Sequence, residues 1–373
     1  MTPFLRKLLG MNWLLFASVV VIGMAGILFI NGASYLQPQY GYWQNQAKFL
    51  GFGLVVFLII SMVDYRWIKW AAAPLFLLSI GLMALTYTSL GREVNGARCW
   101  LQLPGLQQFQ PSQLMILAGI LVLALFLSAC RSWHPALKLL GAGVIVAPAM
   151  ILILKQNDYG MTLVWVPVVG VVLWLAKLPL RWLALVTLIA LTALPLVINF
   201  GLKQHARDRI VTFINPDADP RGTGYAVNQS LIAVGSAGFR GKGFKAQGTQ
   251  LESKLITADE AHTDYIFTTI AEQWGFLGGA ALIAAFAVLL CSCLLTAFRA
   301  SEPFGLLVVG GIVAQVFFHV YQNIGMTIAL MPVTGLPLPL VSYGGTFALV
   351  LMFSLGLVNS VWIHRNAGEE AGE

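Results

Sequence analysis

The chain has 373 residues, of which 58% are hydrophobic and only 10% are charged, and its formal net charge is +7. Soluble domains carry about a quarter of their residues as charged side chains, so the composition excludes a soluble protein and indicates one that crosses a membrane many times. The basic residues are scattered through short loops instead of clustering on one face, which argues against binding to nucleic acid.

Ten apolar runs, bounded by charged residues or by glycine and proline, follow one another along the chain. A spanning helix needs roughly 20 mostly apolar residues, so the runs predict ten transmembrane helices. Their expected ranges are 12–31, 45–63, 71–89, 113–130, 137–154, 160–176, 182–201, 265–298, 304–326 and 341–363. We therefore expect an all-α polytopic membrane protein in which residues 1–373 form a single integral membrane domain.

Lysine and arginine are unequally shared between the two sets of alternating short loops and ends. The richer set, which includes both termini, contains Arg6, Lys7, Arg66, Lys69, Arg131, Lys138, Lys177, Arg181, Arg299 and Arg365. The opposite set of short loops contains only Lys48, Arg92, Arg98 and Lys155. Because positive loops stay in the cytoplasm, we expect both termini to be cytoplasmic and the long connection 202–263 to lie outside the cell.

The large extracellular loop 202–263 has two segments with recognisable character. Residues 223–234 have the pattern of a short amphipathic helix that lies on a membrane surface. Residues 235–248 are rich in glycine and include Arg240, Lys242 and Lys245. Two interpretations of this Gly-rich stretch stay open, a cradle of backbone N–H groups for phosphate and an ordinary flexible surface loop.

Asp264 lies where the large loop enters the eighth predicted helix, within His262-Thr263-Asp264-Tyr265. One interpretation is that Thr263 or Asp264 caps the helix, since carboxylates are favoured at helix N-termini. The other is a partly desolvated carboxylate that accepts a proton from a sugar hydroxyl. Glu272 follows about two turns later and is also a candidate, because ionisable groups at membrane depth are costly and therefore often functional.

Lys155 and Asp158 lie between the fifth and sixth predicted helices, at the same end of the bundle as Asp264. They form an ordinary turn with a local ion pair, or they line a cavity in which Lys155 attracts a diphosphate while Asp158 orients Lys155 or binds a metal ion. Arg98 and Arg209 are further candidate phosphate ligands. For both, the alternative is an arginine that simply faces solvent or lipid headgroups.

Residues 331–339 are apolar but contain three prolines and a glycine, so they cannot form a regular helix. Irregular backbone at membrane depth is tolerated only next to protein or a water-filled cavity. We therefore expect a re-entrant Pro-rich segment before the last helix, with Ser342 and Tyr343 behind it. The four cysteines, Cys99, Cys130, Cys291 and Cys293, lack metal-ligand spacing. They predict neither a disulfide nor a structural metal.

Several separated motifs together resemble the SEDS family, the shape, elongation, division and sporulation proteins. They are Gly96-Ala97-Arg98 with Trp100, Gln110-Pro111-Ser112, Gln156 with Asp158 and Gly160, Asn215-Pro216 with Asp219-Pro220, Gln229-Ser230, Gly241-Lys242-Gly243, Gly248-Thr249-Gln250 and His262-Thr263-Asp264. The string Pro332-Val333-Thr334-Gly335-Leu336-Pro337-Leu338-Pro339 resembles the RodA branch more than the FtsW branch. The resemblance covers nearly the whole chain.

The resemblance implies a peptidoglycan glycosyltransferase that polymerises lipid II during cell elongation and shape maintenance. Asp264 matches the family's essential aspartate and is the expected base for the acceptor 4-hydroxyl in an inverting transfer that expels undecaprenyl diphosphate. Arg98, Lys155 and Arg209 are the expected diphosphate ligands. The other expected substrate contacts are Asp158, Gln229, Ser230, Lys242, His262, Thr263, Glu272, Ser342 and Tyr343. No protein metal site is expected, and assistance by Mg or Mn stays open.

The chain departs from the family at the start of the fourth predicted helix. The family usually carries a glutamate at position 113 and a lysine at position 116, where this chain has Gln113 and Ile116. Losing both charges together is electrically consistent, because either one alone would be buried without a partner. Gln113 is therefore expected to contact substrate only weakly.

Two other functions compete with polymerisation. A flippase for lipid II would use a similar polar cavity, but transporters place their sites near the midplane, whereas the candidate charges here gather toward one face. A purely structural activator of a transpeptidase is the third possibility. The resemblance implies as partners a class B penicillin-binding protein, other membrane proteins of the elongation complex, lipid II and the growing glycan linked to undecaprenyl diphosphate.

Overall fold

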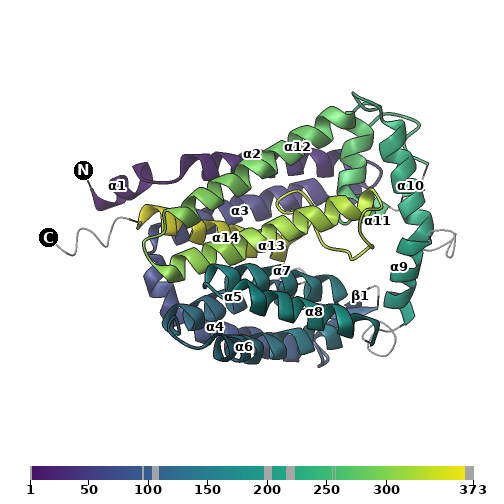
Figure 1. The fold of residues 1–373 in the computed structure, drawn as a ribbon. Helices are drawn as coiled ribbons and strands as arrows, with labels where there is room; N and C mark the ends of the chain where they lie inside the picture. The colour runs from purple at the N-terminus through teal and green to yellow at the C-terminus, as the bar shows by residue number, and fades with distance from the viewer. Residues whose placement is uncertain are drawn as a thin grey trace.

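The computed structural model describes residues 2–94, 96–102, 109–196, 204–215, 223–253, 255–256 and 258–365. Within them the elements are α1 (Pro3–Leu9), α2 (Trp13–Ala33), η1 (Pro38–Tyr40), α3 (Tyr42–Met62), α4 (Tyr65–Leu85), β1 (Gly91–Val94), β2 (Ala97–Leu101), α5 (Pro111–Ala129), α6 (Pro135–Lys155), α7 (Tyr159–Leu175), α8 (Leu180–Leu196), α9 (Gln204–Ile214), α10 (Thr223–Ser236), α11 (Ala258–Ala261), α12 (Ile266–Phe298), α13 (Pro303–Thr327) and α14 (Gly345–Ile363). The N- and C-terminal ends lie at one end of a helical bundle, and α9, α10, α11 and β1 lie at the other (Figure 1).

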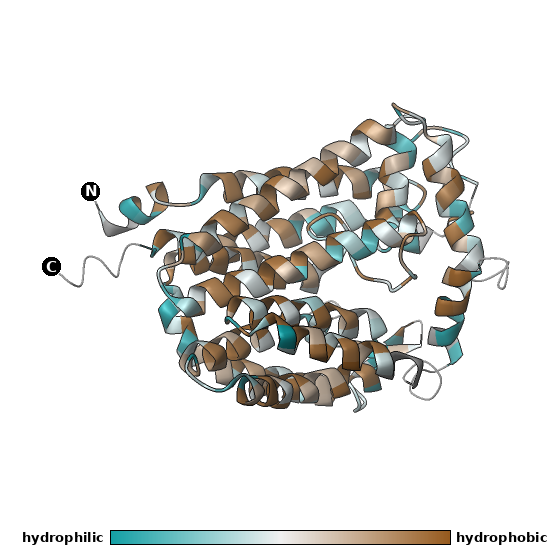
Figure 2. Ribbon diagram, in the orientation of Figure 1, coloured by the Kyte–Doolittle hydropathy of each residue, from teal (hydrophilic) through white to brown (hydrophobic). Residues whose placement is uncertain are grey.

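The structure confirms a polytopic, all-α membrane fold. Among the residues that the structure describes, eight helices are long and apolar enough to cross a membrane, and α7 and α8 contain shorter apolar helices in the remaining two predicted positions. Hydrophobic residues prevail along these helices, while hydrophilic ones gather mostly at helix ends and in the connections (Figure 2). Each of the ten predicted ranges therefore overlaps an apolar helix.

Two predicted helix boundaries are wrong for identifiable reasons. The third helix was expected to begin at residue 71, but α4 begins at Tyr65 because the Asp64 side chain accepts a hydrogen bond from the Arg66 backbone N–H. Arg66 belongs to the helix because its charge is paired with Glu302. The last helix was expected from residue 341, but α14 begins at Gly345, so Ser342 and Tyr343 lie in the preceding loop.

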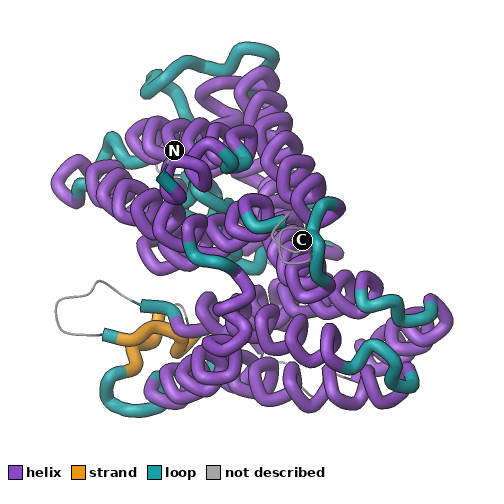
Figure 3. Tube along the Cα trace, turned by 90° about the vertical axis from the view of Figure 1, so that its left-hand side faces the viewer, coloured by secondary structure: helices purple, strands orange, loops and turns teal. Residues whose placement is uncertain are grey.

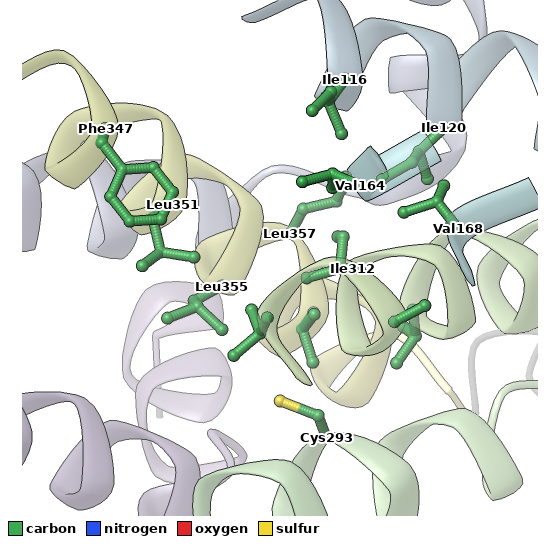
Figure 4. Packing of buried hydrophobic residues seen from close by; sticks show 14 of the residues in the cluster. Ile116, Ile120, Val164, Val168, Cys293, Ile312, Phe347, Leu351, Leu355 and Leu357 are labelled. Carbon is green, nitrogen blue, oxygen red and sulfur yellow. The ribbon is translucent and has the colours of Figure 1, made fainter. Parts of the chain in front are cut away.

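The bundle is centred on α5, α13 and α14, whose apolar windows are 67%, 72% and 72% buried. α13 packs against α5, α7 and α12, and α14 packs mainly against α3. Branched aliphatic side chains from these helices meet in the core (Figure 4); those labelled include Ile116, Ile120, Val164, Val168, Ile312, Leu351 and Leu355. α12 and α2 pack together at the edge of this core.

The end of the bundle that carries α9–α11 contains elements that the sequence analysis did not predict. β1 and β2 form an antiparallel hairpin with Gly91 opposite Leu101, and Figure 3 shows it at the side of the bundle. Helix α9 lies inside the predicted loop 202–263 and was also missed. The predicted amphipathic helix 223–234 is confirmed as α10. Pro216, Asp219 and Pro220 of the family motifs lie outside the described residues.

Helix α12 is broken at Gly275, where φ is 66° and ψ is −161°. The Gly-rich stretch packs directly against this break, and a Cβ on Gly275 would lie 2.3 Å from the Gly241 nitrogen. Lys242 and Gly243 donate backbone hydrogen bonds to the carbonyls of residues 272 and 273, and residues 276 and 277 donate to Gly238 and Phe239. The stretch thus replaces the hydrogen bonds that α12 loses at its kink, so it is packed against α12 and is not a flexible loop, while phosphate binding by its backbone stays a prediction.

The re-entrant Pro-rich segment is confirmed between α13 and α14. Leu336, Leu338 and Leu340 are buried, and a Cβ on Gly26 would lie 2.5 Å from the Leu340 carbonyl oxygen. Gly26 lies seven residues before the end of α2, which corresponds to about 10 Å along a helix. The segment therefore enters the bundle to that depth from the end that carries α9–α11.

Candidate active site

Asp158, Asp264 and Arg209 come from three different parts of the chain and meet at one end of the bundle. Asp158 is the N-cap of α7, and Gly160 in the first turn of α7 packs against the Thr334 carbonyl. The next residue, Gly335, lies against the Asp264 carboxylate, since a Cβ there would be 3.3 Å from Asp264 Oδ2. The Pro-rich segment therefore lies between the two carboxylates. We call Asp158, Asp264 and Arg209 the acidic site.

Asp264 is half-buried in the short link between α11 and α12. The N-cap of α12 is Tyr265 and no side chain caps this helix, so the capping interpretation is wrong. Asn323 of α13 holds the backbone here, donating from Nδ2 to the Asp264 carbonyl at 3.0 Å and to the Leu336 carbonyl at 2.8 Å. The contacts of its backbone thus fix where Asp264 lies, and its carboxylate does not cap a helix.

Burial is the main reason that the pKa of Asp264 is raised to about 6. The negative charge of Glu260 raises this pKa further, the positive charge of Arg209 lowers it, and the charge of Asp158 raises it. At neutral pH the group is still ionised, but it is more basic than an exposed aspartate. A carboxylate of this kind is suited to accept a proton.

Asp158 is also half-buried, and burial raises its pKa to about 6. Its Oδ1 accepts from the Met161 backbone N–H at 3.0 Å and its Oδ2 accepts from Gln110 Nε2 at 2.9 Å. These hydrogen bonds and the charge of Arg209 lower the pKa and so oppose the effect of burial. Both carboxylate oxygens of Asp158 are therefore committed to positioning, whereas Asp264 is the better candidate for proton transfer.

Arg209 lies on α9 and interacts electrostatically with both carboxylates of the acidic site. Its Nη1 donates to the Val333 carbonyl at 3.4 Å. A small cavity of about 20 Å³, large enough for about one water molecule, is lined by Arg209, Thr212 and residues of the Pro-rich segment. α9 thus places one cation beside the two carboxylates, where an anionic leaving group would be neutralised.

Four of the predicted substrate contacts, His262, Thr263, Ser342 and Tyr343, join the Asp264 link to the loop before α14. Ser342 Oγ donates to the Thr263 carbonyl at 2.7 Å, and the Tyr343 backbone N–H donates to the His262 carbonyl at 2.9 Å. The buried His262 ring stacks on Tyr42, with centroids 4.0 Å apart. The structure thus brings these residues next to Asp264, where they hold its backbone in place.

Two of the predicted contacts lie on α10. Ser230 is fully buried, shares a hydrogen bond with Thr268 Oγ1 of α12 at 2.5 Å and donates to the Thr327 carbonyl of α13 at 2.7 Å. Gln229 is half-buried beside it. Ser230 therefore attaches α10 to the two helices that frame Asp264.

Lys242 and Glu272, both predicted as substrate contacts, are paired with each other. Lys242 Nζ is 2.7 Å from Glu272 Oε1, and the same oxygen accepts from the Gln250 backbone N–H at 2.8 Å. The Glu272 side chain is only 2% exposed. This ion pair fastens the Gly-rich stretch to α12 just before the kink at Gly275.

Replacing Lys242 by methionine is expected to lower the stability of the fold by about 3 kcal/mol, because it leaves the Glu272 carboxylate buried without its cation. Thermal unfolding of the purified protein in detergent measures the change. A second substitution, Glu272→Gln, removes the unpaired charge and keeps the acceptor for Gln250, so the double variant should recover most of the loss. A double variant less stable than Lys242→Met would refute this account of the pair.

Arg98 and Lys155 are less closely joined to the acidic site. Arg98 Nη2 donates to the Thr88 carbonyl at 2.7 Å, and its backbone N–H donates to the Gln156 carbonyl. Lys155 is exposed at the end of α6, and the expected Lys155–Asp158 ion pair is absent from the described residues because Asp158 bonds Gln110 and Met161. Both cations lie at the same end of the bundle as Asp264, but the structure does not place them next to Asp264.

Gln113 and Ile116, where the chain departs from the family, are both fully buried on α5. Gln113 Nε2 lies 3.4 Å from Gln110 Oε1, which belongs to the residue that holds Asp158. Ile116 points into the aliphatic core together with Ile120 and Val164 (Figure 4). An apolar side chain in this place explains why position 113 carries an uncharged residue.

Restoring the two charges separately and together tests this explanation. Ile116→Lys and Gln113→Glu should each lower the unfolding temperature, since each buries an unpaired charge. Because the positions are three residues apart on one helix, the double variant should be more stable than the sum of the two losses predicts, by about 1–3 kcal/mol. Additive losses would show that the two side chains do not interact.

Sequence reasoning missed two residues that position the carboxylates, Gln110 and Asn323. Gln110 stands in a motif that was recognised, but its bond to Asp158 spans 48 positions of the chain. Asn323 had a readable signal, because the buried polar residues of α13 recur at helical spacing; they are Gln315, His319, Gln322, Asn323 and Thr327. Gln322 and Asn323 donate to carbonyls of the Pro-rich segment, and His319 Nδ1 lies 3.2 Å from another.

Within the described ranges, no group of three or more His, Cys, Asp or Glu side chains could hold a metal ion. Asp158 and Asp264 supply two carboxylates. Magnesium in phosphate-processing sites is often held by one or two carboxylates while substrate phosphates complete its shell. The acidic site therefore fits a cation that arrives with a diphosphate better than a resident one.

Comparison with known proteins matches residues 8–367 to a family described as cell cycle proteins, which comprises FtsW, RodA and SpoVE. This chain belongs to that family. It is 35% identical over 329 residues to peptidoglycan glycosyltransferase MrdB of Escherichia coli K12, covering 87% of this chain and 86% of MrdB. It is 31% identical over 354 residues to stage V sporulation protein E of Bacillus subtilis, covering 90% and 92% of the two chains.

Solved structures of the family have the same fold. Thermus thermophilus rod shape determining protein RodA superposes with a TM-score of 0.70 at 30% identity, covering 95% of this chain and 97% of RodA. A chain from a peptidoglycan synthase complex, described as coordinating polymerization and crosslinking, gives a TM-score of 0.79 at 31% identity and covers 95% and 98%. The predicted resemblance to the FtsW, RodA and SpoVE family is thus confirmed over nearly the whole chain.

Proposed function

We propose that this protein is a peptidoglycan glycosyltransferase that joins lipid II units into glycan strands for cell elongation and shape maintenance. The observation that carries the proposal is Asp264, a half-buried carboxylate whose pKa is raised to about 6 beside the cation Arg209. Relatives named peptidoglycan glycosyltransferases support the reaction class.

The proposed reaction is an inverting transfer. Asp264 accepts the proton of the acceptor sugar's 4-hydroxyl as that oxygen attacks C1 of the donor strand. The bond from C1 to the diphosphate oxygen breaks on the opposite face, and undecaprenyl diphosphate leaves with the electron pair. Because a diphosphate leaves without protonation, one carboxylate suffices where a glycosidase uses two.

The leaving diphosphate needs cations, and Arg209 is the first of them. Its charge already interacts with both carboxylates of the acidic site, so a diphosphate bound there meets a preorganised positive group. Arg98 and Lys155 remain proposed ligands for the outer part of the same diphosphate. A Mg or Mn ion that arrives with the substrate would neutralise further charge, held by the second lone pairs of the Asp158 carboxylate oxygens, while Asp264 stays free to take the proton.

We also propose that the protein lies in the bacterial cytoplasmic membrane with both termini in the cytoplasm and α9–α11 outside. The excess of lysine and arginine at the terminal end of the bundle supports this orientation. As a partner we propose a class B penicillin-binding protein, because a related chain belongs to a complex described as coordinating polymerization and crosslinking.

The test uses purified protein, alone and with its cognate transpeptidase, in vesicles that contain lipid II on one side. A polymerase yields glycan strands on gels, whereas a flippase moves lipid II across the bilayer and yields none. Glycan product from the wild type supports the proposal. Transfer across the bilayer without product, with both proteins folded, would overturn it in favour of transport.

A further inference from the structure

A groove on the outside of the bundle follows the line along which α2 and α12 pack together, away from the acidic site. It runs beside α2 from Val21 to Phe29 and beside α12 from Trp274 to Ala285. Its cavity measures about 270 Å³, and the residues that line it are apolar except for the indole N–H of Trp274. Both helices are long and apolar enough to span a membrane, so the groove opens toward lipid and not toward water.

The size of the groove limits what can fill it. Its length beside α2 corresponds to about 12 Å, and a helix of that length with a diameter of 10–12 Å occupies roughly 1,000 Å³. A cavity of about 270 Å³ is therefore too small to enclose a transmembrane helix of a partner, which could only lie over it. A single hydrocarbon chain is much thinner than a helix. It has no hydrogen-bonding groups, so it can be buried against apolar side chains without leaving a polar group unpaired.

The end of the groove nearest the acidic site is lined by aromatic rings. Trp274 contacts Phe29 of α2, with centroids 6.1 Å apart, and Phe244 of the Gly-rich stretch, with centroids 6.2 Å apart. Trp274 is 38% exposed. Tryptophan is enriched at the level of lipid headgroups, so this end of the groove is where a headgroup would begin.

A cation lies over one of these rings, that of Phe244. Lys245 Nζ is 5.2 Å from the Phe244 centroid and 2.9 Å from Asn31 Oδ1 at the end of α2. Its backbone has φ of 55°, a conformation that is unusual for lysine. Within the described residues no carboxylate lies within ion-pair distance of Lys245, so its charge is available to an anion at headgroup level.

We propose that the groove between α2 and α12 binds one acyl chain of an anionic phospholipid whose phosphate lies beside Lys245. The apolar cavity, the aromatic rim and the cation follow one another along α2 in the order of chain, interface and headgroup. The Gly-rich stretch, which is also fastened to α12 through Lys242 and Glu272, would thereby contact the membrane through Lys245.

Native mass spectrometry of the intact protein in detergent tests this proposal by counting lipids that stay bound. Phosphatidylglycerol and phosphatidylcholine with identical chains are the probes. The wild type should retain phosphatidylglycerol preferentially, by about fivefold for one cation. Lys245→Gln should remove that preference, and Ala281→Leu, which fills the groove, should prevent retention of both lipids.

Each control makes the same type of substitution at a residue that does not line the groove. Lys48→Gln removes an exposed cation on α3, and Ala284→Leu enlarges an exposed alanine on α12 that does not line the cavity; both should behave like the wild type. Equal retention by the wild type and Ala281→Leu would overturn the proposal. Preferential retention of undecaprenyl phosphate over phosphatidylglycerol would replace the phospholipid by a prenyl lipid, and loss of bound lipid on adding the transpeptidase would replace it by a covering partner helix.

Discussion

Asp264→Asn is expected to lower the rate of lipid II polymerisation by at least about 100-fold, the effect typical of removing a positioned general base. The amide keeps the size of the side chain but cannot take the proton of the acceptor hydroxyl. The variant should still fold, because the structural contacts at this residue involve its backbone carbonyl. Glycan product per unit time, measured with the transpeptidase present, gives the comparison.

Two further variants make the result specific. Glu93→Gln removes an exposed carboxylate of β1 at the same end of the bundle and should leave the rate unchanged. Asp264→Glu keeps a base but moves it by one methylene, so it should retain more activity than Asp264→Asn. Wild-type rates in Asp264→Asn would mean that another group removes the proton.

Arg209→Gln is expected to have the second-largest effect, a loss of about 100-fold, since a preorganised cation at the leaving diphosphate is lost. The same variant should change the pH dependence. Arg209 lowers the pKa of both Asp158 and Asp264, so removing it raises both pKa values. Activity should then begin to fall at a higher pH than in the wild type as the solution is acidified.

The matched control for Arg209 is Arg92→Gln, which removes an exposed arginine from β1. It should change neither the rate nor the pH at which activity falls. If Arg209→Gln lowers the rate but leaves the acid limb of the profile in place, Arg209 does not act on the carboxylates and its proposed position in the site is wrong.

The helices of this protein were predictable because a bilayer requires about 20 mostly apolar residues in each span. Ten apolar runs predicted ten apolar helices, and even the amphipathic helix α10 was readable from its pattern. The failures concern short elements. β1 and β2 are 4 and 5 residues long, too short for a clear period, and tertiary contacts decide their structure. α9 is 11 residues long and amphipathic, so its pattern was readable but was missed.

The sequence predicted candidate residues of the site, but it did not predict which distant residues they contact. Asp158 and Asp264 were chosen from their chemistry and their place near helix ends, Arg209 was chosen from its charge within the long loop, and the role of Asp264 as the base came from the family resemblance. Their partners lie far along the chain, and no local pattern predicts that Gln110 bonds Asp158 or that Asn323 holds Asp264. Lys242 and Glu272 are a second example of a distant connection. Their charges suggested substrate binding, but the two side chains are paired with each other across 30 positions of the chain.

The pH profile of lipid II polymerisation tests the role of Asp264 most directly. With a pKa of about 6, Asp264 loses its basic form as the pH falls, so the wild-type rate should decline with a midpoint near pH 6.

Because two interacting carboxylates titrate as a pair, Asp158→Asn is measured alongside. It removes a charge that raises the pKa of Asp264, so its acid limb should persist and move to lower pH. Any residual activity of Asp264→Asn should show no such limb. A wild-type rate that stays constant well below pH 6, or an acid limb that survives in Asp264→Asn, would contradict the assignment of Asp264 as the base.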